Sequence, residues 1–319
     1  MSAGPLPATV LFEPWSLGDV VIAASVLREL SAPVALACHP QWHALVRGAL
    51  PERSELDLIA VKLPYTTRTR SSPFDSAGRQ ETLARTDITQ VLSIRGDARD
   101  YAAARKAFPR ARIRMNGWIR FWGRKSALVN APYALGLLRP QNRYQSWASL
   151  ADIPFERIEQ NYRQSQSCAL SSGPVVIHLG AQWRSKQYPH VAALRDRLRE
   201  LGRQVSLVAG PGDLLPAGIN EAEVARIADQ QLIAALRSAT HVITNDSGPM
   251  HLAALLGCRT IAVARTSPIE EWLPPATIVV RSPATPRGYR PHRRYMSDET
   301  LSDWPSIKTV INAFPADRR

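Results

Sequence analysis

The sequence has little that would suit a secreted or membrane-spanning chain. Its longest apolar runs fall far short of the roughly 18 residues that a spanning helix needs. The first residues, MSAGPLPATVLFEPW, lack the basic region and the long apolar region of a secretory signal. The three cysteines, Cys38, Cys168 and Cys258, are too widely spaced to form a CxxC pair or a disulfide framework. These features predict a protein without a membrane span in a reducing, cytoplasmic setting.

Acidic residues are missing from two segments of a strongly basic chain. The 319 residues include 40 Lys and Arg against 27 Asp and Glu, a net charge of +13. The first 165 residues hold 22 basic and 14 acidic residues, so +8 of the +13 lies there. Tyr101 to Ala151 contains no acid but ten basic and eight aromatic residues, and Arg281 to Ser297 carries five arginines and no acid. Such patches suit a polyanion, while an Arg-rich, well-solvated surface is the alternative.

Apolar runs and helical patterns alternate along the chain, which predicts two parallel α/β units. The expected domains are residues 1–163 and 174–301, joined by a Ser- and Gln-rich linker over 161–174. We expect a C-terminal helix within residues 302–319 that packs back on the N-terminal domain. The expected strands are residues 8–12, 33–37, 56–61, 90–94, 174–178, 205–209, 241–244, 260–264 and 277–280. The other expected helices cover about residues 20–30, 191–201, 232–238 and 250–256.

The first motif, Ser16 to Asp19, lies between the first expected strand and the first helix. Gly18 permits a tight turn or a close backbone approach. Asp19 would face the carboxyl edge of the sheet, where ligands of such sheets bind. The residue is either a carboxylate base presented to a ligand or a helix cap near the positive end of the dipole.

The second motif, HLGAQWRSKQYP, follows the strand that ends at His178. Its Gly180-Ala181 turn and Lys186 can offer backbone N–H groups and an ammonium to phosphate oxygens. Alternatively, the aromatic residues only pack the loop and Lys186 is solvated.

The third motif, Thr244 to Ala254, joins a strand end to a helix with Pro249 in its first turn. Free N–H groups and the helix dipole make such a start an anion site, suited to a diphosphate. The alternative is an ordinary helix capped by Asp246 or Ser247, with His251 in the core. His251 has no companion at metal-ligand spacing, so we expect no metal there.

In their order and spacing, GDVVIAASVLREL, HLGAQWRSKQYP and NDSGPMHLAALLG followed by RTIAV resemble the bacterial heptosyltransferases, glycosyltransferase family 9. The resemblance runs from about Val10 to Val263. It implies the GT-B fold, in which two Rossmann-like domains face a central cleft. It also implies transfer of a heptose from ADP-heptose to the inner core of lipopolysaccharide, with inversion and without a metal. No cofactor is implied, because the ADP-sugar is a substrate.

The resemblance assigns roles to residues that match the family's motifs. Asp19 is the implied general base and Lys186 the implied catalytic cation near the donor phosphates. The implied donor-binding residues are Gly180, Ala181, Lys186, Asp213, Asp246, Ser247, Gly248, Pro249 and His251. Since the motifs place the donor in the second half, the basic first half is left for an anionic glycolipid acceptor. The residues predicted to bind it are Gly18, Arg120 and Arg124.

Three positions depart from the family pattern: Ser25 and Leu179 stand where Pro is usual, and Tyr188 where Trp is usual. None removes an implied chemical group, but they leave the sugar and the acceptor open. One alternative is a related transferase that uses another nucleotide sugar or a non-lipopolysaccharide acceptor. Another is a polyanion-binding protein with a vestigial nucleotide cleft, although no nucleic-acid module is recognisable. The main expectation is an enzyme at the cytoplasmic face of the inner membrane that does not bind nucleic acid.

Overall fold

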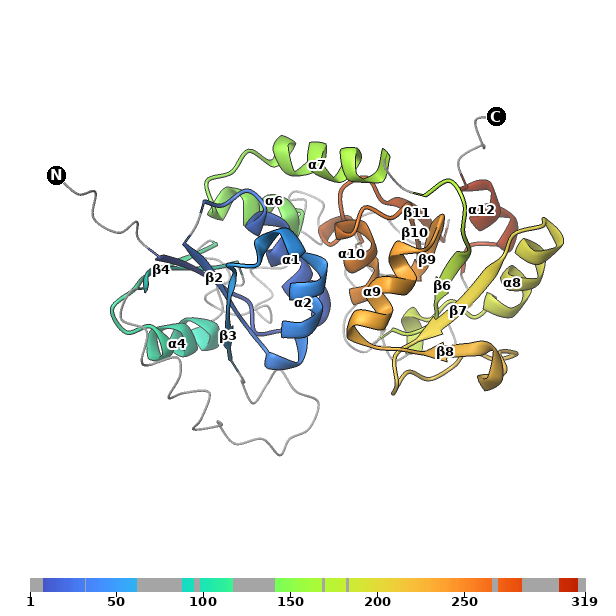
Figure 1. The fold of residues 1–319 in the computed structure, drawn as a ribbon, viewed down its shortest axis with the longest axis horizontal. Helices are drawn as coiled ribbons and strands as arrows, with labels where there is room; N and C mark the ends of the chain where they lie inside the picture. Colours follow the sequence, from blue (N-terminus) through green and yellow to red (C-terminus); the bar gives the residue numbers. More distant parts are fainter. Residues whose placement is uncertain are drawn as a thin grey trace, which may run out of the picture. The chain divides into compact units, whose positions relative to one another are not determined.

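The chain forms two compact units, Met1–Ile158 and Glu159–Arg319, in a computed structural model (Figure 1). Each unit is a parallel α/β sheet with helices, which confirms the predicted fold class. The structure describes residues 8–31, 33–61, 88–94, 98–116, 141–167, 170–181, 184–265, 269–282 and 304–314.

The first unit holds a five-stranded parallel sheet in the order β3-β2-β1-β4-β5. Its central strand β1 is buried through Val10, Leu11 and Phe12, because helices cover a parallel sheet on both faces. Phe12 meets Phe108 edge to face, with ring centroids 6.4 Å apart. The elements of this unit are β1 (Ala8–Phe12), α1 (Leu17–Leu27), β2 (Val34–Cys38), η1 (Pro40–Trp42), α2 (His43–Ala49), η2 (Pro51–Arg53), β3 (Asp57–Ala60), β4 (Ile88–Ser93), α4 (Ala98–Ala107), β5 (Arg112–Met115) and α6 (Arg143–Leu150).

The second unit holds a six-stranded parallel sheet in the order β11-β10-β9-β6-β7-β8. Strand order reverses between β6 and β9, and the carboxyl ends at such a switch point are where α/β sheets bind ligands. The elements are β6 (Val175–His178), η4 (Arg184–Lys186), α8 (Val191–Glu200), β7 (Val205–Ala209), η5 (Glu221–Glu223), β8 (Val224–Arg226), α9 (Asp229–Arg237), β9 (His241–Asn245), α10 (Gly248–Leu255), β10 (Thr260–Ala264), η6 (Ile269–Glu271), β11 (Ile278–Arg281) and α12 (Ile307–Asn312).

The linker expected over residues 161–174 is a loop only in part. Helix α7 (Phe155–Ser167) covers its first half and crosses the boundary between the units at residues 158 and 159. The segment is rich in Glu, Gln and Arg, which are good helix formers. Ile158 and Tyr162 lie one turn apart and are both buried, so they anchor the helix.

The C-terminal helix α12 packs in the core of the second unit, where Val310 is fully buried. It lies with α8 on one side of the sheet, and α9 and α10 lie on the other (Figure 1). The expected packing of this helix on the N-terminal domain stays a prediction. Ile307, Val310 and Ile311 have the i, i+3, i+4 spacing of an apolar helix stripe, and the second unit's sheet buries that stripe.

Among the residues that the structure places, no helix is both long and apolar enough to cross a membrane.

Candidate functional site: the switch point of the second sheet

The second and third motifs lie side by side at the carboxyl ends of β6 and β9. The two strands are paired in parallel register, with His178 opposite Thr244. The side chain of Asn245 joins the loops that follow them: its amide Nδ2 donates to the carbonyls of Leu179 and Gly180 at 3.0 and 3.2 Å. Its Oδ1 accepts the backbone N–H of Tyr188 at 2.9 Å. Asn245 therefore holds both ends of the second motif's loop, a role that sequence reasoning missed.

Lys186 and Asp246 form an ion pair at this edge, with 2.7 Å between Nζ and Oδ2. The Asp246 side chain is 7% exposed and that of Lys186 is 21% exposed, so the pair is largely shielded from water. An ammonium has three N–H donors, and a carboxylate uses one of them here. The remaining donors and the partial exposure leave Lys186 able to bind a phosphate oxygen while still paired with Asp246. The structure thus brings together the two charged residues that sequence analysis had placed in separate motifs.

Asp213 packs directly on Gly180, so that a Cβ at position 180 would overlap its carboxylate. The carboxylate accepts the backbone N–H of Gly210 at 2.8 Å. Arg226, at the end of β8, donates to the backbone carbonyls of Gly210 and Asp213 at 2.9 and 2.6 Å. Position 180 therefore needs a glycine, because the Asp213 carboxylate lies where a Cβ would be. Arg226 holds the backbone of the loop that carries Asp213, and the motifs did not reveal this residue.

His178, the last residue of β6, is buried and is close enough to interact with the Asp213 carboxylate and the Gly180 backbone. Burial lowers the pKa of His178, while the charge of Asp213 and a hydrogen bond with the Gly180 backbone partly oppose that shift. The net effect is a pKa below the ordinary value of a histidine. The imidazole lies next to the site as a packed core residue, and its titration links the fold of the second unit to pH.

The start of α10 has the geometry expected of an anion site. Ser247 occupies the N-cap position with extended backbone, but its side chain makes no capping hydrogen bond. Its hydroxyl instead donates to the carbonyl of Asn245 at 3.3 Å. Ser247, Gly248 and Pro249 are all half-exposed, whereas His251 one turn on is buried. The helix is thus not closed by a serine cap, and its N-terminus remains available to an anion.

In the first unit, Asp19 lies in the first turn of α1 and is not its N-cap residue. The N-cap is Ser16, whose hydroxyl donates to Asp19 Oδ2 at 2.7 Å. Gly18 is buried and Asp19 is half-buried. The carboxylate is therefore oriented by a neighbouring hydroxyl, partly exposed, and close to the positive end of a helix dipole.

A second carboxylate, that of Glu13, lies just past the end of β1 and is buried. Burial raises the pKa of Cys38 to about 12, and the charge of Glu13 adds to that shift. The Cys38 thiol is therefore inert as a nucleophile. Sequence analysis did not predict that Glu13 is buried; in the sequence it is only an acidic residue directly after an apolar run.

Several arginines of the acid-free segment 101–151 have structural roles. Arg105 donates to the carbonyls of Pro109 and Ala111, and Arg114 forms a two-pronged pair with Asp152 at 2.6 and 3.1 Å. Arg143 is buried. Part of this basic segment therefore stabilises the fold. The predicted acceptor residues Arg120 and Arg124 lie outside the described residues.

No group of His, Cys, Asp and Glu residues within the described ranges could hold a metal ion.

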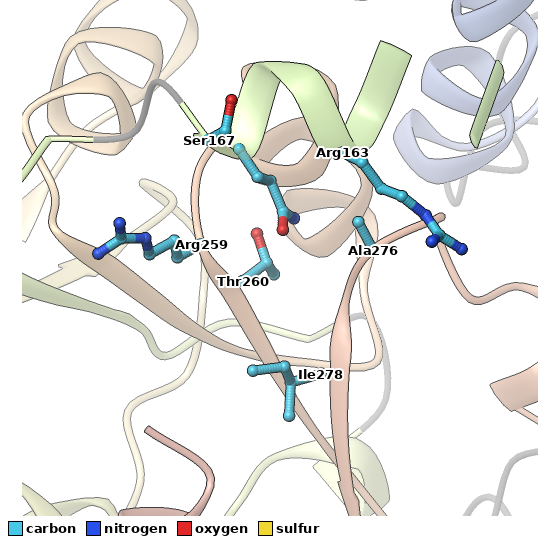
Figure 2. Close-up of a pocket in the computed structure, with 7 residues that line it drawn as sticks. Arg163, Ser167, Arg259, Thr260, Ala276 and Ile278 are labelled. Carbon is cyan, nitrogen blue, oxygen red and sulfur yellow. The ribbon is translucent and has the colours of Figure 1, made fainter. Parts of the chain in front are cut away.

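A pocket of about 270 Å³ lies at the amino edge of the second unit's sheet, opposite the switch-point site and beside Thr260 and Ile278. Figure 2 shows the side chains of its two arginines, Arg163 and Arg259, pointing away from each other. This pocket is therefore separate from the switch-point site, and its cations do not converge on a ligand.

Three solved structures with a similar fold are glycosyltransferases. An E. coli heptosyltransferase, WaaC with ADP, has a TM-score of 0.58 at 16% identity and covers 88% of this chain and 94% of its own. A family 9 glycosyl transferase from Veillonella parvula has a TM-score of 0.62 at 17% identity and covers 98% of both chains. E. coli ADP-heptose lps heptosyltransferase II has a TM-score of 0.57 at 18% identity and covers 96% and 97%. The fold is thus that of the GT-B glycosyltransferases.

Residues 141–285 match the model of glycosyltransferase family 9 (heptosyltransferase). The second and third motifs lie within this matched segment, and the chain is a glycosyltransferase, as predicted. No match was found among curated protein sequences.

Proposed function

We propose that the protein transfers a heptose from ADP-heptose to the inner core of lipopolysaccharide, with inversion at the anomeric carbon and without a metal. The observation that carries this proposal is the Lys186–Asp246 pair, 2.7 Å apart at the switch point of the second sheet. A partly exposed ammonium beside an uncapped helix N-terminus suits a nucleotide diphosphate.

Each predicted donor residue has a place in this proposal. The N–H groups at Ser247 and Gly248 and the ammonium of Lys186 would bind the diphosphate. Asp246, fixed by Lys186, would bind a sugar hydroxyl. Asp213, close to the backbone of Gly180, would bind the ribose. The remaining donor residues, Ala181, Pro249 and His251, would shape the loop and the helix start.

The reaction needs one base and one anion site. The acceptor oxygen would attack the anomeric carbon while the bond from that carbon to the donor's diphosphate oxygen breaks. The proton of the acceptor hydroxyl would pass to the carboxylate of Asp19, which Ser16 orients. ADP would leave with increased negative charge, and preorganised donors with Lys186 would stabilise that charge in place of a metal.

The acceptor would bind through the first unit, since +8 of the net charge lies in the first 165 residues. An anionic core glycolipid at the cytoplasmic face of the inner membrane fits a basic and aromatic segment. Arg120 and Arg124 lie in that segment, and Gly18 lies beside Asp19. Charge reversal at both arginines should weaken acceptor use and spare donor binding. Equal damage to both would make the segment purely structural.

The experiment is a transfer assay with purified protein, ADP-heptose and a core lipid that lacks heptose. We expect ADP release, a lipid heavier by one heptose, an inverted anomeric configuration and full activity in EDTA. Calorimetry with ADP-, GDP-, UDP- and dTDP-sugars would separate this donor from another nucleotide sugar. Tight binding of nucleic acid at physiological salt, without binding of any nucleotide sugar, would contradict the proposal and support a polyanion-binding protein.

A further inference from the structure

The segment over residues 304–314 crosses one face of the second sheet from its carboxyl edge to its amino edge. At one end Trp304 and Pro305 contact Tyr188, which lies at the carboxyl edge beside Asn245. At the other end Phe314 packs on His241, the first residue of β9, with ring centroids 4.9 Å apart. Between them Val310 is buried in the core. We call residues 304–314 the strap.

Tyr188 connects the strap to the donor site. Its hydroxyl donates to the carbonyl of Pro305 at 2.9 Å, across 117 residues of sequence. Its backbone N–H donates to Asn245, whose amide in turn holds Leu179 and Gly180. Because a single buried residue makes both contacts, the position of the strap is coupled to the loop that carries Lys186.

Trp304 is the side chain that holds this contact in place. Its ring lies 5.6 Å from that of Tyr188 at an interplanar angle of 66°. On the carboxyl side of β10, the guanidinium of Arg265 lies 5.7 Å from the centre of the same indole. Cation–π and edge-to-face contacts each favour one orientation of the ring. Trp304 therefore joins the loops after β6 and β10 on either side of β9.

We propose that the carboxyl-edge end of the strap, Trp304 and Pro305, supports the donor site and that Trp304 is a positioning residue, which holds Lys186 in place for the donor diphosphate through Tyr188. The inference rests on the proposed function for the identity of the ligand. It adds that donor affinity depends on a segment 117 residues away in sequence from the loop it supports. Donor binding and the contact of Trp304 and Pro305 with Tyr188 should then stabilise each other, because linkage between two sites is reciprocal.

The experiment uses the full chain and compares substitutions at the two ends of the strap. Trp304→Ala removes the contact with Tyr188, and Trp304→Phe restores an aromatic ring. Phe314→Ala is the matched control: it removes another half-buried aromatic residue of the strap, but at the edge away from the site. Calorimetry with ADP measures the donor Kd, and thermal unfolding measures stability.

We expect Trp304→Ala to raise the Kd for ADP about tenfold, which corresponds to one weakened charge-assisted hydrogen bond. Trp304→Phe should bring the Kd most of the way back to that of the wild type. Phe314→Ala should lower the melting temperature and leave the Kd unchanged, since a folded protein binds with its own affinity however marginal its stability. An unchanged Kd in Trp304→Ala, or equal increases in Trp304→Ala and Phe314→Ala, would overturn the proposal.

Hydrogen exchange tests the coupling without any ligand. In Trp304→Ala the Tyr188 amide, bonded to Asn245, should exchange faster, while the β7 amides keep their protection. If wild-type protein does not bind ADP, the proposed donor is wrong. Hydrogen exchange at Tyr188 then tests by itself whether Trp304 positions this loop. Unchanged protection at Tyr188 would then refute the coupling.

Discussion

Lys186 and Asp246 offer a direct test of how the donor site is held together. Replacing Lys186 with Met leaves a 7% exposed carboxylate without the ammonium that lies 2.7 Å from it. Replacing Asp246 with Asn keeps a similar shape and removes the negative charge. In the double variant neither charge remains, so the loss of stability should be much smaller than the sum of the two single losses.

The magnitude follows from the geometry. Two unit charges 2.7 Å apart attract by about 6 kcal/mol at an effective dielectric constant of about 20. Desolvation of the two ions offsets several kcal/mol of this attraction. The desolvation cost is larger for Asp246 than for the partly exposed Lys186. We expect a net coupling energy of about 2 kcal/mol, within the range seen for close, shielded pairs.

Native-state hydrogen exchange of β6 and β9 amides measures opening of the second unit by itself, which suits a chain of two units. The matched control is Arg197–Glu200 on α8, an ion pair of 2.8 Å whose side chains are 53% and 63% exposed. That pair should show a coupling below about 0.5 kcal/mol. A similarly small coupling for Lys186–Asp246 would refute the view that burial makes this pair strong.

Three further predictions concern other parts of the protein. Asp19→Asn should lower turnover by about 100-fold or more and leave the Kd for ADP unchanged, as general-base loss does; normal turnover in the transfer assay would remove Asp19 from the mechanism. Gly180→Ala should displace the Asp213 carboxylate and raise the Kd for ADP about tenfold or more, at a strain of about 1–3 kcal/mol; an unchanged Kd by calorimetry would exclude Asp213 from the donor site. His178 has a lowered pKa in the folded state, so below about pH 6.5 the unfolded chain binds a proton that the folded one does not, and stability should fall with falling pH by up to about 1.4 kcal/mol per pH unit until the folded pKa is reached. His178→Gln should remove this slope from urea midpoints measured between pH 5 and 7, and an unchanged slope would assign it to other groups.

Local patterns were sufficient to predict the central strands and the helices α1, α8, α9, α10 and α12, but not α2, α4, α6 and α7. The runs at residues 8–12, 205–209 and 260–264 are buried strands with those bounds, since central parallel strands are apolar on both faces. The outer strands β5 and β8 were missed. Arg112 and Arg114 in β5, and Arg226 in β8, interrupt any apolar run, because an edge strand need not bury both faces.

The expected linker is partly a helix, and sequence analysis missed this for a different reason. Residues 161–167 and α12 are amphipathic, and an apolar stripe in the sequence does not show which unit buries it. Residues 161–167 continue α7, whose Tyr162 is buried, and Val310 of α12 is buried in the second unit's core. Asn245 was predicted only as part of the third motif. Its three side-chain hydrogen bonds depend on atoms of Leu179, Gly180 and Tyr188 that approach it only in the folded sheet.

By itself, then, the sequence determined a basic α/β chain with three polar motifs after buried strands, and with them the resemblance to glycosyltransferase family 9. It could do so because turn residues, apolar runs and motif spacing are local, and parallel strands necessarily bring their carboxyl ends to one edge. Only the tertiary structure decided that Lys186 pairs with Asp246 across 60 residues and that Tyr188 bonds Pro305 across 117. Those contacts depend on which faces pack together. The packing of these faces is set by the free energy of the whole unit, so the sequence of a short segment does not determine it.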